Sequence, residues 1–298
     1  MAAPGGNLVI LGLGLIGGSL ARAARANGFC ERVIGCGHRA PSLERGVELG
    51  VIDEYTLDID EAVRRADILV ICAPTLTAAS LLERILPQLG DDGPVITDVA
   101  SVKGNLYRTA LQVSGSMPPN LVLGHPIAGS ERSGVDASSE QLFVNHRVIL
   151  TPVEGNDPQA VELVRSMWLA TGAEVVDMGV EEHDAVLAAT SHLPHALAYT
   201  LVDALAASDA SDEIFHCAAG GFRDFTRIAS SDPVMWRDIA LANRDALLAA
   251  MDNFSASLGN LRAAVESGDG EAMHVIFTRA KKARDEFAEI LAQRSKAD

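Results

Sequence analysis

Residues 10–19 read ILGLGLIGGS, and this glycine-rich stretch decides the fold that the sequence predicts. It carries the spacing G-x-G-x-x-G between an apolar run that predicts a strand and an alanine-rich run that predicts a helix. In that context Gly12 allows a tight turn, Gly14 lets the backbone approach a pyrophosphate, and Gly17 lets helix and strand pack closely. The stretch therefore predicts dinucleotide binding at a helix N-terminus rather than a purely structural turn. The predicted cofactor contacts are Gly12, Leu13, Gly14, Leu15, Ile16 and Gly17.

Strand and helix patterns alternate after this turn. The predicted strands are residues 7–13, 32–35, 68–73, 95–99, 121–124, 147–150 and 174–176, and the predicted helices are residues 15–27, 42–49, 75–86 and 161–170. Continuous apolar runs such as ILVICA at 68–73 are typical of strands that are covered on both faces. The βαβ units predict a mostly parallel sheet, and hence an α/β Rossmann-type domain over residues 1–180.

The pattern changes at about residue 181, where strand signals end. Helical periodicity predicts helices at 185–207, 233–251, 254–266 and 270–292, and therefore an all-α domain over residues 181–298. The apolar surface of such a domain is often buried against a second subunit. We therefore expect a homodimer formed through this helical dimerisation domain.

Composition narrows the class of protein. The formal net charge of −16 opposes non-specific binding to nucleic acid or to an anionic membrane, so an anionic substrate needs a local cluster of arginine or histidine. The four cysteines have no metal-ligand spacing, and we expect no metal site. The N-terminus lacks the basic residues of a signal peptide, and no apolar window reaches the ~20 residues of a membrane span. These features predict a cytoplasmic protein without a membrane segment.

The turn after the second predicted strand lacks an expected acid. An Asp or Glu near this position usually binds the ribose 2′-hydroxyl of NAD, but residues 36–39 read CGHR. The glycine leaves room, and His38 and Arg39 could face a 2′-phosphate. The alternative is a solvated basic turn that binds NAD less selectively. NAD and NADP thus both stay open, with NADP slightly favoured.

Two segments carry candidate catalytic side chains. Residues 121–131, LVLGHPIAGSE, end an apolar run at His125, whose ordinary pKa suits proton transfer near neutral pH. Taken alone, this residue is better explained as an ordinary loop histidine held by a backbone hydrogen bond. Residues 98–103, DVASVK, follow a predicted strand. There Ser101 could bond a nearby histidine or a substrate hydroxyl, or cap a helix, and Lys103 is expected to be a solvated residue of the first helical turn.

Two further segments lie in the helical half. Residues 191–195, SHLPH, place His192 and His195 on one helix face, but no accompanying ligand motif supports a metal pair. Residues 220–227, GGFRDFTR, set two arginines and an acid after a flexible break, which by itself is typical of a solvated helix start.

Taken together, these motifs resemble the prephenate/arogenate dehydrogenase family. The similarity covers GLGLIGGS, DVASVKG, GHPIAGSE, SHLPHALA and GGFRDFTRIASSDPVMWRDI in the family's order, from about residue 7 to residue 290. It implies a Rossmann domain followed by a helical dimerisation domain. It also implies oxidative decarboxylation of prephenate or arogenate with hydride transfer to NAD(P), in tyrosine biosynthesis.

The resemblance also implies roles for individual residues. His125 corresponds to the histidine that accepts the proton of the substrate's ring hydroxyl, and Ser101 to the serine that supports it. Arg227 corresponds to the arginine that binds a substrate carboxylate. The remaining implied positions are Asp224 as the ionic partner of that arginine, His195 in the substrate pocket, Glu131 at the active-site entrance, and His192 and Trp236 as pocket supports.

Two other classes fit less well. The 3-hydroxyacid dehydrogenases use a lysine in the helical half, and no lysine occurs between residues 171 and 279. A regulatory protein that binds NAD(P) without turnover would not need His125, Ser101 and Arg227 together. No residue decides between prephenate and arogenate, and an enzyme that accepts both is consistent with the sequence.

Overall fold

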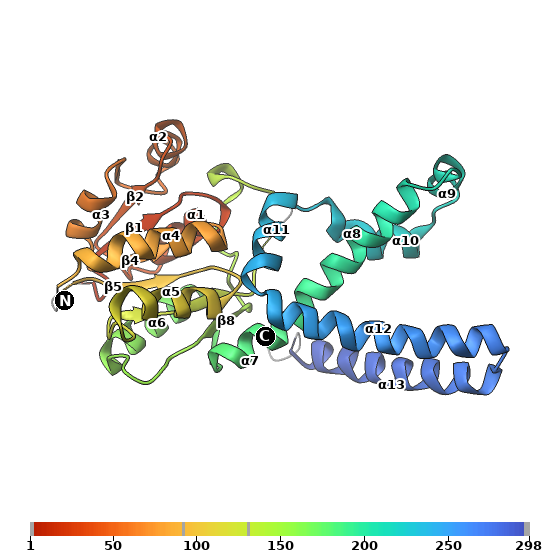
Figure 1. The fold of residues 1–298 in the computed structure, drawn as a ribbon. Helices are drawn as coiled ribbons and strands as arrows, with labels where there is room; N and C mark the ends of the chain where they lie inside the picture. The colour runs from red at the N-terminus through yellow and green to blue at the C-terminus, as the bar shows by residue number, and fades with distance from the viewer. Residues whose placement is uncertain (1–2, 91–92, 130–131, 295–298) are drawn as a thin grey trace. The chain divides into compact units, whose positions relative to one another are not determined.

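The computed structural model describes residues 3–90, 93–129 and 132–294 (Figure 1). The chain divides into two compact units, Met1–Arg244 and Asp245–Asp298. The first unit holds both sheets and the helices through α11, and the second holds almost all of two long helices. Within the described ranges, no helix is long and apolar enough to cross a membrane.

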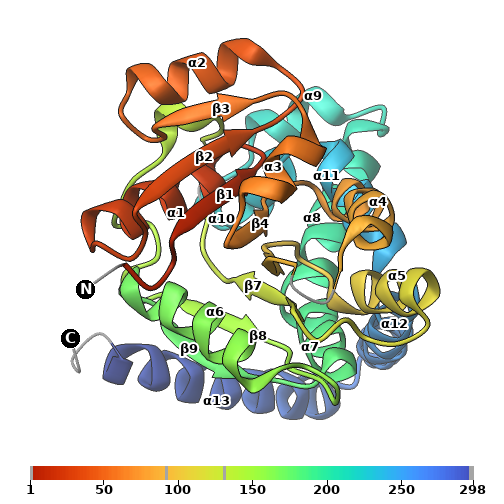
Figure 2. The ribbon, with the colours of Figure 1, turned by 90° about the vertical axis from the view of Figure 1, so that its left-hand side faces the viewer.

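The larger sheet has six parallel strands in the order β3-β2-β1-β4-β5-β6. Figure 2 labels β3, β2, β1 and β4 of this sheet. Its strands are β1 (Asn7–Leu11), β2 (Arg32–Cys36), β3 (Glu54–Thr56), β4 (Ile68–Ile71), β5 (Val95–Asp98) and β6 (Leu121–Val122). The helices of this domain are α1 (Leu15–Ala26), α2 (Ala40–Glu48), α3 (Ile59–Arg65), α4 (Thr75–Ile85), α5 (Lys103–Ser114) and α6 (Pro158–Ala170). This strand order confirms the predicted Rossmann-type fold. In such sheets, ligands bind at the carboxyl ends of the strands where the order reverses, here between β1 and β4.

Both faces of this sheet are buried. Alternate residues of β1 enter two different cores: Leu8 and Ile10 pack with side chains of α1 and α6, and Val9 and Leu11 pack with side chains of α4 and α5. These four residues are at most 3% exposed. Since successive side chains of a strand point to opposite faces, covering both faces requires a continuous apolar run rather than an alternating one.

A second sheet positions the candidate histidine. Its order is β7-β8-β9, with β7 (Gly124–Pro126) antiparallel to β8 (Arg147–Leu150), and β8 parallel to β9 (Glu174–Asp177). The prediction of one strand over residues 121–124 was therefore wrong, because the chain leaves the first sheet after β6 and enters the second at Gly124. The backbone of Gly124 is held by a buried pair at the end of β5: its N–H donates to Asp98 (3.3 Å) and its carbonyl accepts from Lys103 Nζ (2.6 Å).

The helical part of the first unit follows β9. It comprises α7 (Val180–Leu187), a π-helical turn (Ala188–His192), α8 (Leu193–Ala206), α9 (Ser211–His216), α10 (Gly220–Thr226), a 3-10 turn (Arg227–Ser230) and α11 (Pro233–Ala242). The single helix predicted over residues 185–207 is thus interrupted by a π turn. Pro194 has no N–H to donate to the carbonyl of Thr190, and the hydrogen-bond ladder widens just before it.

The second unit consists of α12 (Arg244–Ser267) and α13 (Gly270–Arg294). Gly268 joins them with a φ of +67°, a backbone conformation that favours glycine. The predicted helix over 233–251 ends at Ala242, because Asn243 leaves helical geometry with φ −107° and ψ 32° before α12 begins. Several large apolar side chains of α12 and α13 are about half exposed, among them Leu258, Val265 and Phe277.

Candidate active site

The glycine turn between β1 and α1 has the geometry that a dinucleotide requires. Gly12 has a φ of +105°, and a Cβ there would lie 2.2 Å from the Cys72 carbonyl oxygen. A Cβ at Gly17 would lie 2.3 Å from the Gly12 carbonyl oxygen, so neither position accepts a side chain. Gly14 differs, because nothing lies within 4 Å of a Cβ there, and it precedes the first turn of α1. This open space beside the N–H groups of a helix N-terminus fits a pyrophosphate.

The end of β2 lies directly beside this turn, since Gly12 N–H donates to the Cys36 carbonyl at 2.8 Å. His38 and Arg39 follow and are exposed. Gly37 has no positive φ, and the nearest atoms to a Cβ there are 3.9 Å away. Glycine is therefore not required at position 37 by the backbone or by packing. Its effect is to leave open space after β2.

His125 lies within β7 and is 8% exposed. Its Nδ1 is 2.9 Å from Nε2 of His183 in α7, and Nδ1 of His183 is 2.8 Å from Oδ1 of Asp184. Burial lowers the pKa of His125 well below its usual value, and the nearby His183, Lys103 and His192 lower it further. The imidazole is therefore neutral near pH 7 and has the form that accepts a proton.

Asp184 also binds the start of α5. Its Oδ1 accepts from Lys103 N–H and its Oδ2 from Gly104 N–H, both at 2.8 Å. The residue that precedes α5, Val102, has no side chain that can cap a helix, so Asp184 supplies the cap from 80 residues away. The same carboxylate thus holds α5 and orients His183.

Lys103 is fully buried, and its expected solvation was wrong. Its ammonium forms an ion pair with the buried Asp98 and donates to the Gly124 carbonyl, directly before His125. The reason is the position of α5, whose first residue, Lys103, contacts both the end of β5 and the start of β7. A long side chain there reaches the end of β5 instead of solvent.

Family comparisons agree with this arrangement. Residues 20–177 match the family described as "Prephenate dehydrogenase, nucleotide-binding domain", and residues 179–279 match "Prephenate dehydrogenase, dimerization domain". The chain belongs to the prephenate dehydrogenase family. It is therefore an NAD(P)-dependent oxidoreductase that decarboxylates its substrate oxidatively in tyrosine biosynthesis.

Several prephenate dehydrogenase relatives are similar to this chain over nearly their full length. The cyclohexadienyl dehydrogenase of Zymomonas mobilis is 38% identical over 93% of this chain and 94% of the relative. The structure of prephenate dehydrogenase from A. aeolicus in complex with hydroxyphenyl propionate and NAD+ has a TM-score of 0.87 and 36% identity, covering 94% of this chain and 98% of that one. Synechocystis arogenate dehydrogenase has a TM-score of 0.80 and 30% identity, covering 94% and 99%.

Three of the predicted substrate-binding residues, His195, Asp224 and Arg227, lie on the helical elements after α7. His195 is half-buried, its Nδ1 bonds the Ser191 carbonyl (2.9 Å), and its ring stacks on Trp236 with centroids 3.5 Å apart. Burial lowers the pKa of His195, and the nearby Arg227 guanidinium lowers it further. Arg227 is therefore close enough to act electrostatically on the His195 ring.

The other predicted site residues are Ser101, Asp224 and Glu131. Ser101 lies in the partly exposed turn before α5, where Val102 is the N-cap, and no hydrogen bond joins Ser101 to another described residue. Asp224 forms an exposed ion pair with Arg223 at 3.2 Å, and its pairing with Arg227 stays a prediction. Glu131 lies outside the described residues.

Sequence reasoning missed the buried hydrogen-bond network behind His125. His183, Asp184 and Asn243 are all buried, and Asn243 Nδ2 contacts both the Asp184 carbonyl (2.8 Å) and Nδ1 of His192 (3.0 Å). The signal was present in the spacing of α7, whose buried stripe places a His-Asp pair where an amphipathic helix normally carries apolar residues. Buried polar groups need partners, so this pair pointed to a network.

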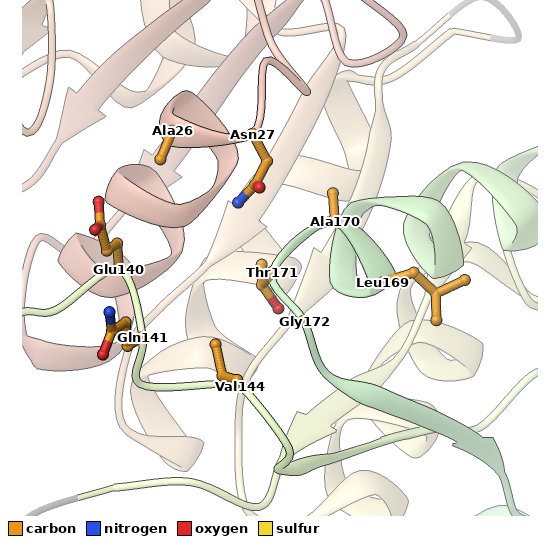
Figure 3. Close-up of a pocket in the computed structure, with 9 residues that line it drawn as sticks. All are labelled: Ala26, Asn27, Glu140, Gln141, Val144, Leu169, Ala170, Thr171 and Gly172. Atoms are coloured by element: carbon orange, nitrogen blue, oxygen red, sulfur yellow. The ribbon is translucent and has the colours of Figure 1, made fainter. Parts of the chain in front are cut away.

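A separate pocket of about 530 Å³ lies elsewhere on the first unit (Figure 3). It is formed by the C-terminal end of α1 at Ala26 and Asn27, the segment 140–144 and the end of α6 at 169–172. Because α1 has 12 residues, this pocket is about 18 Å from the glycine turn along the helix. None of the predicted site residues lines it.

Proposed function

We propose that this chain converts prephenate to 4-hydroxyphenylpyruvate, with His125 as the proton acceptor for the ring hydroxyl. The observation that carries the proposal is the buried, neutral His125 imidazole whose Nδ1 is already bonded to His183. The remaining nitrogen, Nε2, has no hydrogen-bond partner among the described residues and is left to accept a proton. When bound at the glycine turn, NAD(P) supplies the hydride acceptor.

The protein's part in the reaction is to remove a proton and to hold an anion. Taking the hydroxyl proton at His125 strengthens hydride donation from the carbon that bears the hydroxyl. The ring ketone that results is an electron sink, so the carboxylate para to it leaves as CO2 and the ring becomes aromatic. A chain with a net charge of −16 needs local positive charge to hold a dianionic substrate, and Arg227 beside His195 supplies it.

Arogenate is the second candidate substrate. It differs from prephenate in carrying an ammonium instead of a side-chain keto group, and a relative with 30% identity is an arogenate dehydrogenase. The Zymomonas mobilis relative is a cyclohexadienyl dehydrogenase. Measuring kcat/KM for each substrate with each nucleotide tests the proposed function. Turnover of neither substrate with NAD or NADP would contradict it.

We further propose that Arg227 binds a substrate carboxylate. Replacing Arg227 by alanine is expected to raise KM for prephenate about 10- to 100-fold, because a charged hydrogen bond contributes about 1.5–3 kcal/mol. Steady-state kinetics would measure this, with Arg32→Ala as the control, since Arg32, at the start of β2, is exposed and paired with Glu54. An unchanged KM in Arg227→Ala would remove Arg227 from the substrate site.

The open turn after β2 favours NADP. Gly37 leaves space, and His38 and Arg39 are exposed beside the glycine turn, where they can face a 2′-phosphate. Gly37→Asp is expected to shift the ratio of kcat/KM for NADP over NAD towards NAD by about tenfold or more, because the new carboxylate repels a phosphate and accepts from the 2′-hydroxyl. Arg39→Ala should lower kcat/KM with NADP only. A wild-type enzyme that prefers NAD would show this assignment to be wrong.

A homodimer formed through the helical domain is also part of the proposal. Residues 179–279 match a dimerisation domain, and α12 and α13 keep apolar side chains about half exposed. Sedimentation equilibrium would give the subunit number.

The two family matches also support a domain boundary near residue 180, between a nucleotide-binding domain over 1–180 and a helical substrate and dimerisation domain over 181–298. The cytoplasmic location stays a prediction.

A further inference from the structure

Three buried side chains form a linear hydrogen-bonded chain behind the proton acceptor. Asp184 Oδ1, the two ring nitrogens of His183 and Nδ1 of His125 follow one another at 2.8 and 2.9 Å. His183 is fully buried, and the other two are at most 8% exposed. The chain joins α7 to β7, two elements separated by more than 50 residues, so the tertiary fold creates it.

The direction of each hydrogen bond follows from the acid at the end of the chain. His183 Nδ1–H and two backbone N–H groups of α5 donate to the Asp184 carboxylate, and the first of these holds the Asp184 pKa low against the effect of burial. An ionised carboxylate only accepts, so His183 must carry its proton on Nδ1. Burial lowers the pKa of His183, so its Nε2 is a lone pair that accepts from Nδ1–H of His125. Nε2 of His125 is then the unprotonated nitrogen.

We propose that His183 and Asp184 are positioning residues that fix His125 in the Nδ1–H tautomer and stabilise its protonated form during turnover. The inference rests on the proposed role of His125 as the proton acceptor. One proton leaves the substrate hydroxyl and binds Nε2 of His125. The positive charge is then shared through Nδ1–H with His183, which the Asp184 carboxylate faces, and Asp184 itself stays ionised.

Other charged groups lie near these three hydrogen-bonded side chains and affect the protonation of His125 and His183. Those that face His125 or His183 are Lys103 of α5, Asp98 of β5, Asp184 of α7 and His192 of the π turn. Lys103 is already paired with Asp98. Asp184 is thus the anion left to stabilise an imidazolium at His125.

The tautomer can be measured without turnover. In the intact enzyme labelled with ¹⁵N-histidine, protonated and unprotonated ring nitrogens give separate resonances, and His125 is assigned by the signal that His125→Ala loses. We expect wild-type His125 to carry its proton on Nδ1. In His183→Gln, whose amide can donate as well as accept, we expect a mixture of tautomers. A wild-type His125 that is protonated on Nε2 would overturn the inference.

Kinetics provide a second measurement, which would not change if His183 and Asp184 had a purely structural role. Asp184→Asn removes the anion but keeps one oxygen to accept from α5. Its kcat is expected to fall about 10- to 100-fold with KM for prephenate nearly unchanged, and the acid limb of kcat to move to lower pH, because loss of a negative charge disfavours the imidazolium. His146→Gln, at an exposed histidine bonded to the Val144 carbonyl, is the control. An unmoved acid limb in Asp184→Asn would contradict the inference.

The two proposals fail in different ways. If wild-type enzyme turns over neither prephenate nor arogenate, the proposed function is wrong, whereas the tautomer measurement still reports on the chain of hydrogen bonds. If wild-type enzyme is active but His183→Gln keeps its kcat and a single Nδ1–H tautomer, the function stands and the positioning role is wrong. Should either variant fail to fold, as shown by circular dichroism, the wild-type tautomer decides the question.

Discussion

Replacing His125 by alanine is expected to lower kcat for prephenate by about 10²- to 10⁴-fold, the usual contribution of a positioned general base. The buried imidazole is the proton acceptor that the geometry provides, and its Nδ1 is already bonded to His183. Alanine removes the base without adding volume to the strand. We therefore expect the loss in kcat rather than in binding, and rapid-quench or steady-state kinetics would measure it.

The control for this prediction is nucleotide binding. No hydrogen bond joins His125 to the described residues of the glycine turn between β1 and α1, so the Kd of NADP, followed by fluorescence, should be unchanged in His125→Ala. Added imidazole should restore part of the activity if the cavity left by the side chain admits it. Near-normal turnover in His125→Ala would exclude His125 from the mechanism.

The pH dependence of the wild-type enzyme follows from the same residue. His125 accepts a proton only when neutral, so activity is lost as pH falls through its pKa. Burial and the positive groups nearby hold this pKa well below its usual value. The kcat is therefore expected to stay level through neutral pH and to fall only below the ordinary imidazole value of about 6.5. A midpoint above this value would show that another group limits the reaction.

Local sequence patterns predicted the main sheet well because its strands are buried on both faces. The run ILVICA became β4, and the glycine turn joined β1 to α1 as expected. The start of helix α5 at Lys103 was anticipated but its cap was not, for a physical reason: the cap is Asp184, which lies 80 residues away. The break between β6 and β7 also depends on a distant pair, because Lys103 and Asp98 hold the backbone of Gly124.

In the candidate site, as in the sheet, sequence patterns predicted some residues and missed those that depend on tertiary contacts. The family resemblance predicted roles for His125, His195 and Arg227, which the fold places in β7, in α8 and in the 3-10 turn after α10. Residues that act through tertiary contacts were not found. His183 and Asp184 lie on the buried stripe of α7, but their hydrogen-bond partners become apparent only when α7 packs against α5 and β7.

Lys103 is the residue whose environment differs most from its prediction, and its removal should have a large effect on stability. Lys103→Met keeps the length of the side chain but leaves the Asp98 carboxylate buried without its counter-ion and the Gly124 carbonyl without a donor. Removing one partner of a buried ion pair typically costs about 3–5 kcal/mol, since the other charge remains desolvated. We expect a loss of this size in the free energy of unfolding, measured by urea titration with circular dichroism.

A double variant separates the charge from the packing at this position. Lys103→Met combined with Asp98→Asn removes both charges, and replacing a whole buried pair is often close to neutral. The double variant should therefore recover much of the stability that Lys103→Met loses, while Lys282→Met, at an exposed lysine 3.8 Å from Glu286, should leave the transition unchanged. If Lys103→Met unfolds at the wild-type urea concentration, the pair does not stabilise the fold. If the double variant is no more stable than the single one, the lysine acts through packing and its bond to Gly124 rather than through its charge.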